Sequence, residues 1–397
     1  MYLTTEEEMA YNGNCGPLQE WAMKFLTKYG DIYGAEKLIP VDSAFTFLPA
    51  SRTFDPEIYN LLCESKLAVP TYSHITGETE HWKEVSREPP SKDFLRTYVN
   101  MGISLTSTCA PYMCGYCPVY NSHISSVESS CLVYLNSVLG ARTHRESFPS
   151  VIASAVTGKT PYFGLHTDEG RKGNLLINVE TTLSNPADYD ALGYFAGEIA
   201  GIDVPVFNGI RGTLGLEKLK GFGASQASSG GVGLYHVVGV TPEAPTLDKA
   251  FQGDKPEETV SFTENDLEET YDALSTHGST DVDYVALGCP HLSIKELMKV
   301  AELLKGKKVD ENVHLWLLTV PMIRWQAEMM GIRDVIRAAG GRIATVCWSS
   351  FKPTPTVMAT DSGKTAHYAP AHYPKADFWF GSLEQCIETA LTGRWKM

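Results

Sequence analysis

Cysteine is the residue whose spacing in this 397-residue sequence most directly suggests chemistry. Three of the nine cysteines, Cys109, Cys114 and Cys117, lie within the stretch TCAPYMCGYC (108–117). An odd number of cysteines in a long chain argues against a disulfide framework and favours metal ligands, reactive thiols or core packing. The sequence has no second CxxC pair for a zinc knuckle, and proline and glycine break the stretch into turns where a redox CxxC would open a helix. We therefore expect Cys114 and Cys117 to be buried thiols in a tight loop, with a ligand or redox role as the alternative.

Two other cysteines, Cys289 and Cys347, end predicted strands in the last third of the chain. The segments DYVALGC (283–289), NVHLWLLTV (312–320) and RIATVC (342–347) alternate with two helical segments, which predicts a β-α-β-α-β run. Such runs form parallel sheets, and their ligands sit at the carboxyl ends of the strands. Both thiols therefore point to the same kind of sheet edge, although each one alone also suits a buried structural cysteine.

The two helical segments of this run carry clear end signals. In SIKELMKVAELL (293–304), Ser293 and Glu296 have the spacing of a capping box. The second segment, IRDVIRAAGG (332–341), ends on a glycine pair. The apolar residues of the first segment share one helical face, as in an amphipathic helix: Ile294, Leu297, Met298, Ala301 and Leu304.

Basic residues gather after another predicted helix, which runs from about Ser129 to Gly140. The residues delivered beyond its end are Arg142, Thr143, His144 and Arg145. Two arginines within four residues suit bidentate binding of a carboxylate or a phosphate. Solvated surface charges are the alternative interpretation of the same residues.

Two stretches rich in small residues are candidates for anion-binding turns. In TDSGKTAHY (360–368), the backbone N–H groups, the Ser362 hydroxyl and the Lys364 ammonium can form such a turn, although an ordinary loop has the same composition. The tract 221–245 is also rich in glycine and serine, but its spacing fits neither a P-loop nor a dinucleotide-binding turn. A flexible or close-packed backbone is therefore the favoured interpretation of 221–245.

The middle of the chain is predicted to be α/β as well. Strands are expected over 174–180 and 203–210, with a helix over 191–201 between them, and the polar segment 247–270 is interpreted as a solvated connector. The fold class is therefore α/β with several units and largely parallel sheets. The approximate units are an N-terminal part (1–170), a middle part (171–265) and a C-terminal doubly wound part (266–397).

Composition and charge exclude several classes of function. The formal net charge of −14 repels phosphate backbones, and no basic stripe offsets it, so we expect no nucleic-acid partner. The start MYLTTEEEMA is acidic where a signal peptide is basic, and no run of roughly 18 apolar residues occurs. We therefore expect a cytoplasmic protein that does not bind a membrane.

Five long motifs follow one another in a fixed order: TCAPY (108–112), ESS with NSVLGARTHRE (128–130 and 136–146), GLYHVVGVTPEAP (233–245), ALGCPHLS (286–293) and DSGKTAHY (361–368). Together they resemble the aconitase X family, specifically its large catalytic subunit, and the resemblance extends over nearly the whole chain. It implies an aconitase-like arrangement in which three α/β domains surround an iron–sulfur cluster and a separate small subunit forms the swivelling fourth domain. It also implies dehydration of a small hydroxy acid, such as 5-phosphomevalonate or cis-3-hydroxy-L-proline.

The resemblance further implies which residues hold the cluster. Cys109, Cys289 and Cys347 match its three cysteine ligands, whereas Cys114 and Cys117 do not match cluster positions. Three thiolates leave one iron of a 4Fe-4S or 2Fe-2S cluster without a protein ligand, and an iron of this kind is a Lewis acid for a substrate hydroxyl and carboxylate.

Elimination of water also requires a base and groups that hold the substrate. The candidates for the base and its catalytic partners are His166, Lys364, Ser129 and Ser362, with a serine of the small subunit as the alternative. The resemblance implies that Arg142 and Arg145 bind the anionic groups of the substrate. The full set of expected substrate-binding residues is Asn136, Arg142, Thr143, His144 and Arg145.

The chain departs from the family pattern at two places. Family members commonly carry asparagine at the position of His144, and a His/Gln-x-x-Gly stretch where this chain has FTFLPASRTF (45–54). The substrate can therefore differ from the two named above. A non-enzymatic iron–sulfur sensor or scaffold with the same fold is the alternative function, and a zinc protein that uses the same thiols is a third hypothesis.

Overall fold

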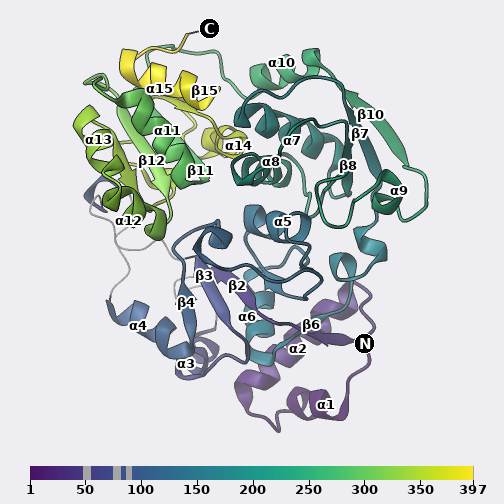
Figure 1. Cartoon of the computed structure of the whole chain (residues 1–397). Helices are drawn as coiled ribbons and strands as arrows, with labels where there is room; N and C mark the ends of the chain where they lie inside the picture. The colour runs from purple at the N-terminus through teal and green to yellow at the C-terminus, as the bar shows by residue number, and fades with distance from the viewer. Residues whose placement is uncertain (48–54, 75–81, 86–91, 397) are drawn as a thin grey trace.

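The computed structural model describes residues 1–47, 55–74, 82–85 and 92–396. Within these ranges the strands form four sheets, and three α/β units lie around the centre of the molecule (Figure 1). The three larger sheets are parallel throughout, which confirms the α/β class with largely parallel sheets. In the described part of the chain, no helix is both long and apolar enough to cross a membrane.

In the first unit, the segments that follow β4 and β5 begin at the same edge of one sheet. Its central sheet has the order β4-β3-β2-β5, and β1 and β6 form a separate antiparallel pair. Since parallel strands share their carboxyl edge, the chain after β4, which contains Cys109, and the chain after β5, which begins α5, start from the same edge. The elements are α1 Thr5–Tyr11, α2 Pro17–Ile32, β1 Leu38–Pro40, β2 Ala44–Phe47, α3 Pro56–Glu64, β3 Thr71–His74, α4 Lys92–Met101, β4 Ile103–Leu105, β5 Ser125–Ser126, α5 Ser129–Ser137, α6 Phe148–Thr157 and β6 Lys159–Pro161.

The second unit confirms the strands and the helix expected in the middle of the chain. Its sheet has the order β10-β7-β8-β9. The connector expected over 247–270 is wrong, because this segment forms α9, β10 and the start of α10. Strand β10 is a largely exposed edge strand, and its polar composition hid it in the sequence. The elements are β7 Leu175–Val179, α7 Pro186–Ala200, β8 Pro205–Asn208, α8 Leu216–Ser229, β9 His236–Val237, α9 Leu247–Ala250, β10 Glu258–Phe262 and α10 Glu264–Ala273.

Helices α7 and α8 pack in close backbone contact, and glycine permits it. A Cβ atom at Gly193 would lie 2.4 Å from the Phe222 carbonyl oxygen, and one at Gly221 would lie 2.0 Å from Asp190 Oδ1. Both distances are too short for a carbon atom, so these positions require glycine. The close-packed interpretation of the small-residue tract is therefore confirmed for its helical part.

The third unit is the predicted doubly wound sheet, with strand order β13-β12-β11-β14-β15. The capping box of Ser293 and Glu296 at α11 is present. Of the expected apolar face of α11, Leu297, Ala301 and Leu304 are buried, but Met298 is 48% exposed. The elements are β11 Tyr284–Leu292, α11 Ile294–Leu304, β12 His314–Thr319, α12 Pro321–Met329, α13 Ile332–Ala339, β13 Arg342–Ala344, β14 Val357–Thr360, α14 Gly363–His372, β15 Asp377–Phe380 and α15 Leu383–Thr392.

Candidate functional site

Three cysteines from two units lie close to one another. Cys109 follows β4 of the first unit, whereas Cys289 lies near the end of β11 and Cys347 follows β13 in the third unit. Burial raises the pKa of the Cys109 thiol, and the Glu128 carboxylate and the thiols of Cys289 and Cys347 raise it further. Burial and Cys347 likewise raise the pKa of Cys289. The three thiols are therefore close enough to oppose one another's ionisation.

A buried histidine that the sequence did not single out joins the segments of these cysteines. His291 Nδ1 lies 2.8 Å from Thr108 Oγ1, next to Cys109 in the chain. His291 Nε2 lies 3.5 Å from the carbonyl oxygen of Val346, which precedes Cys347. Since His291 is itself two residues after Cys289, its ring connects all three cysteine segments. Burial lowers its pKa to about 3, so the imidazole is neutral and can accept one hydrogen bond and donate another.

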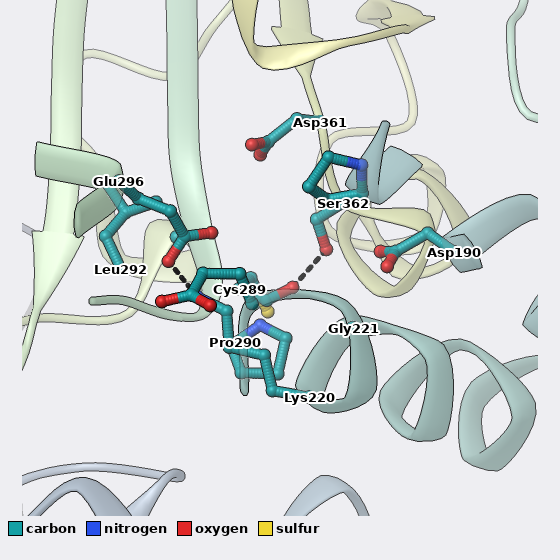
Figure 2. Close-up of a pocket in the computed structure, with 12 residues that line it drawn as sticks. Asp190, Lys220, Gly221, Cys289, Pro290, Leu292, Glu296, Asp361 and Ser362 are labelled. Atoms are coloured by element: carbon teal, nitrogen blue, oxygen red, sulfur yellow. Dashed lines mark hydrogen bonds and ion pairs between the residues drawn. The ribbon is translucent and has the colours of Figure 1, made fainter. Parts of the chain in front are cut away.

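Local backbone geometry fixes the position of Cys289. Gly288 has φ +106°, and a Cβ atom there would lie 2.2 Å from the Leu318 carbonyl oxygen of the neighbouring strand. Only glycine suits such a place. On the other side, the Ser362 hydroxyl donates to the Cys289 carbonyl oxygen (Figure 2) and accepts from Thr365 N at 3.0 Å as the N-cap of α14. Ser362 is thus held in structural hydrogen bonds beside the thiols.

Lys364 and Glu128 form an ion pair beside the thiols. Lys364 Nζ donates to Glu128 Oε1 at 2.9 Å and lies 3.5 Å from Ser129 Oγ and 3.3 Å from Ser130 Oγ. Burial opposes the charge of Lys364, but Glu128, Cys289 and Cys109 outweigh it and raise the pKa of Lys364. Burial likewise opposes the charge of Glu128, yet the Lys364 ammonium lowers the pKa of this carboxyl below its usual value. Both side chains are therefore ionised.

The first turn of α5 presents this ion pair. Glu128 is the N-cap of α5 and accepts from Cys131 N at 2.6 Å and from the Ser130 hydroxyl at 2.7 Å. The positive end of the helix therefore adds to the stabilisation of the carboxylate. Sequence reasoning placed Ser129 and Lys364 in the site but missed Glu128, although it opens the ESS motif directly before the helix.

The donor set fits an iron–sulfur cluster. Such clusters bind cysteine thiolates, and Cys109, Cys289 and Cys347 bring three thiols together near the Lys364 ammonium. Among the described residues, no three His, Cys, Asp or Glu side chains surround one point as ligands of a single ion. Three cysteine thiols are the kind of donor set that an iron–sulfur cluster takes.

A small polar cavity lies behind Cys289. Its volume is about 20 Å³, room for about one water molecule. Burial raises the pKa of Asp190 to about 8 and of Asp361 to about 7. Lys220 Nζ bonds to Glu296 at 2.5 Å and to the His291 carbonyl at 2.8 Å, which ties α8 to the end of β11. Figure 2 shows these groups around Cys289. A hydroxy acid does not fit here, so the cavity supports the site without being its substrate pocket.

A larger hollow, of about 550 Å³, lies elsewhere, between α10 and the C-terminal segment. Aromatic side chains, among them Tyr271, Trp379 and Trp395, form much of its lining. None of the predicted site residues lines it. Size alone therefore does not identify the functional site of this chain.

The other predicted site residues occupy a separate set of contacts. Arg142 pairs with Asp168 at 2.5 Å and donates to the His166 carbonyl oxygen at 3.1 Å. The His166 ring is buried, and its Nδ1 lies 3.0 Å from His123 Nδ1. Burial lowers the pKa of His166 well below its usual value, so this imidazole is neutral. Arg142 and His166 thus contact each other, whereas Lys364 and Ser129 lie at the thiols.

The remaining residues of the GARTHRE motif are largely engaged within the protein. Asn136 is buried and bonds to both backbone groups of Thr143, while Thr143 Oγ1 accepts from Ser126 N at 3.0 Å. Burial lowers the pKa of His144 to about 4, and its ring contacts Phe163. Arg145 is exposed. The other departure from the family pattern, 45–54, lies outside the described residues from position 48 onward.

Cys114 and Cys117 lie in and after a short 3-10 turn, Pro111–Cys114. Cys114 is half-buried, and burial raises the pKa of its thiol to about 11. Burial also raises the pKa of Cys117, although this residue is largely exposed rather than buried as expected. Burial is what raises both of these pKa values, whereas the thiols of Cys109 and Cys289 also lie near other thiols and near Lys364.

Comparisons with known proteins cover almost the whole chain. Models of the aconitase X first, second and third domains match residues 1–169, 173–272 and 282–392. The phosphomevalonate dehydratase large subunit of Methanocaldococcus jannaschii is 35% identical over 98% of this chain and 100% of its own length. The cis-3-hydroxy-L-proline dehydratase of Pseudomonas aeruginosa is 32% identical over 96% of this chain and 68% of its own length.

Solved structures give the same result at the level of the fold. The crystal structure of Thermococcus kodakaraensis aconitase X in its holo-form aligns with a TM-score of 0.84 and 32% sequence identity. The alignment covers 98% of this chain and 100% of the other. The match therefore includes all three units and not only the doubly wound one.

Proposed function

Because this chain belongs to the aconitase X family, we propose that it is the large subunit of an iron–sulfur-dependent hydro-lyase that dehydrates a small hydroxy acid. The observation that carries the proposal is the meeting of three thiols from two units beside the buried Lys364–Glu128 pair. The names of the relatives support the reaction class, since both kinds are dehydratases.

In this proposal Cys109, Cys289 and Cys347 hold the cluster. When bound, the cluster supplies a Lewis acid that weakens the bond between the substrate carbon and its hydroxyl group. His291 and Ser362 orient the cysteine segments through the hydrogen bonds described above. Both the 4Fe-4S and the 2Fe-2S form agree with three thiol ligands.

Lys364, Glu128 and Ser129 form the polar side of the proposed site. The Lys364 ammonium attracts the carboxylate of the substrate and stabilises negative charge on the oxygen that leaves. The ionised Glu128 keeps Lys364 charged and oriented, and Ser129, whose hydroxyl lies 3.5 Å from Lys364 Nζ, is the candidate in this chain for accepting the proton. A base from the small subunit is the alternative for the carbon-bound proton. Ser362 has a positioning role in this scheme, because its hydroxyl already bonds to the Cys289 carbonyl oxygen and to Thr365 N.

The substrate is proposed to be 5-phosphomevalonate or cis-3-hydroxy-L-proline. The names of both kinds of relative support them, and their identities to this chain are similar, at 35% and 32%. Asn136, Arg142, Thr143, His144, Arg145 and His166 remain proposals for substrate binding and catalysis. Of these, Arg145 has the most exposed side chain and is best suited to meet an anionic group.

The partner in this proposal is a small subunit that resembles the aconitase swivelling domain. Relatives named large subunit imply such a partner. About a third of the length of the longer relatives also lies outside their match with this chain.

The test is an anaerobic assay of the chain with and without the small subunit encoded in the same genome. We expect iron and sulfide with broad visible absorption in both samples. The loss of one water from 5-phosphomevalonate or cis-3-hydroxy-L-proline, followed by mass spectrometry, should occur only with the small subunit. Cys347→Ser should lose the cluster and the activity, and the matched control Cys114→Ser should keep both. A complex that holds the cluster but converts neither compound would contradict the proposal and favour a sensor or scaffold.

A further inference from the structure

The outer face of α12 is apolar although it points to solvent. Met322, Trp325 and Met329 are 56%, 63% and 70% exposed. Their spacing of three and four residues places them in one row along the helix. We call these three residues the methionine–tryptophan face. The C-cap residue Met330 and Met298 of α11, which packs beside α12, are also about half exposed.

This face is separate from the side of α12 that packs into the core. Ala327 is fully buried, and Ile323 packs against the hydrophobic cluster of the third unit. These two residues are four apart and lie on the inner side of the helix. Helix α12 therefore has two apolar sides, of which the protein covers only one. By contrast, the neighbouring α13 exposes Asp334 and Arg337, as a solvated helix does.

An exposed apolar row of this kind marks a binding surface. Soluble proteins seldom leave large contiguous apolar patches in contact with water, and those they leave are often functional. Tryptophan is enriched among residues that dominate binding energy, and methionine adapts its shape to a partner. An ion pair between Arg333 and Glu328, at 3.2 Å, lies at the C-terminal end of α12. The combination is that of an interface with an apolar centre and a polar rim.

The position of α12 connects this face with the site. Helix α12 begins directly after β12, whose end is in register with the ends of β11 and β13. Cys289 and Cys347 leave the sheet at this same edge. Figure 1 shows α12 at the lower left of the third unit, toward the first unit. A protein seated on the start of α12 would therefore lie at the sheet edge from which the segments of Cys289 and Cys347 leave.

We propose that the methionine–tryptophan face of α12 is the docking surface for the small subunit. This inference rests on the proposed function, which requires such a partner. Two observations support this occupant. Relatives are named as large subunits, and about a third of the length of the longer relatives lies outside their match with this chain. The surface predicted on the small subunit is an apolar hollow that receives the Trp325 ring.

The experiment measures binding of the purified small subunit from the same genome to the cluster-loaded chain, by calorimetry. Trp325→Glu and Met322→Glu each place a charge within the face, and each should weaken binding at least about thirtyfold, as for an interface hot spot. Both side chains are more than half exposed, so the fold and the visible spectrum should not change. Tyr2→Glu is the matched control, because Tyr2 is 83% exposed on the first unit, and its affinity should equal that of the wild type.

The outcomes separate this inference from the proposed function. If the wild type binds the small subunit and both α12 variants bind it equally well, the surface is wrong and the proposed function stands. If the wild type binds no small subunit, the partner itself is wrong. If Trp325→Glu instead converts a dimer of the isolated chain to a monomer, as seen by light scattering, the face belongs to a second copy of this chain and the inference is overturned.

Discussion

At the scale of single residues, His291 connects more segments of the site than its neighbours in the chain do. Its ring touches the neighbours of Cys109 and Cys347, and its own backbone follows Cys289 by two residues. Its carbonyl oxygen also accepts from Lys220 at 2.8 Å. These contacts join the backbone segments that carry the three thiols.

We expect His291→Leu to weaken retention of the cluster while leaving the chain folded. Leucine fills similar space but cannot bond to Thr108, so the Cys109 segment loses its tie to the third unit. The loss of visible absorption during exposure to air should be at least about tenfold faster than in the wild type. His314→Leu, a change at the opposite end of the neighbouring strand β12, is the control and should match the wild type. Equal rates for both variants would remove the positioning role of His291.

The Lys364–Glu128 pair allows a double-mutant test. Lys364→Met leaves the Glu128 carboxylate without its counter-charge among buried groups, and such changes destabilise by about 3–5 kcal/mol. Adding Glu128→Gln should restore most of the free energy of unfolding, because no uncompensated charge then remains. Activity should stay lost in the double variant, since the ammonium is absent. Urea denaturation and the dehydration assay measure the two quantities, and recovery of activity in the double variant would exclude a catalytic role for the pair.

At the scale of elements, the contact of α7 with α8 fixes the approach to the site. Asp190 of α7 lies against Gly221 of α8 and accepts from Gly363 N at 2.9 Å, at the start of α14. Three helices therefore meet at one carboxyl group. The start of α14 carries Ser362 and Lys364, so the helix pair positions both.

Gly221→Ala should disturb this junction. Its methyl group would lie 2.0 Å from Asp190 Oδ1, so the carboxyl group or the helices must move. We expect a loss of about 1–3 kcal/mol in the free energy of unfolding and a fall in activity. Gly215→Ala is the control, because its nearest atom is a flexible carboxylate oxygen at 3.3 Å, and it should cost less than about 1 kcal/mol. Equal stabilities of the two variants would show that α7 and α8 separate easily.

The elements also show what a sequence can and cannot reveal. Cys289 and Cys347 were placed correctly at one sheet edge because strand ends follow from hydrophobic pattern alone. Glu128 and His291 were missed, since their importance lies in partners from other units that no spacing encodes. Strand β10 was missed because an exposed edge strand resembles a loop in composition. Periodicity placed Met298 on the apolar face of α11, yet its side chain is about half exposed. The spacing of apolar residues does not distinguish a core position from an exposed apolar surface.

At the scale of the whole molecule, each unit contains one buried carboxyl group with a raised pKa. Burial raises the pKa of Glu146 to about 7, of Asp190 to about 8 and of Asp361 to about 7. In the unfolded chain the same groups titrate near their ordinary values, about 4. Between these pH values the three carboxyl groups bind more protons in the folded chain than in the unfolded chain. Buried histidines such as His291 and His144, whose pKa values are lowered to about 3 and about 4, have the opposite effect below about pH 6.5.

Stability should therefore fall as the pH rises from about 6.5 to 8, where the histidines are neutral in both states, and level off above the folded-state pKa values. The three carboxyl groups together should lower the free energy of unfolding by about 3 kcal/mol over this range. Thermal unfolding at pH 6.5 and 8.5 measures the effect. Glu146→Gln should reduce the difference between the two pH values, since it removes one of the three groups. A stability that is flat over this range would show that these carboxyl groups are ionised in the folded chain.

The division of the cysteines between two units has a consequence beyond catalysis. Cys109 belongs to the first unit and Cys289 and Cys347 to the third, so one cofactor bound to all three fastens units that are far apart along the chain. A cofactor that binds only the folded arrangement adds its binding free energy to the free energy of folding. A link between residues far apart in the chain also removes the most conformational entropy from the unfolded chain. Oxygen that destroyed the proposed cluster would thus remove one link between the first and third units, and limited proteolysis should then cleave the chain faster.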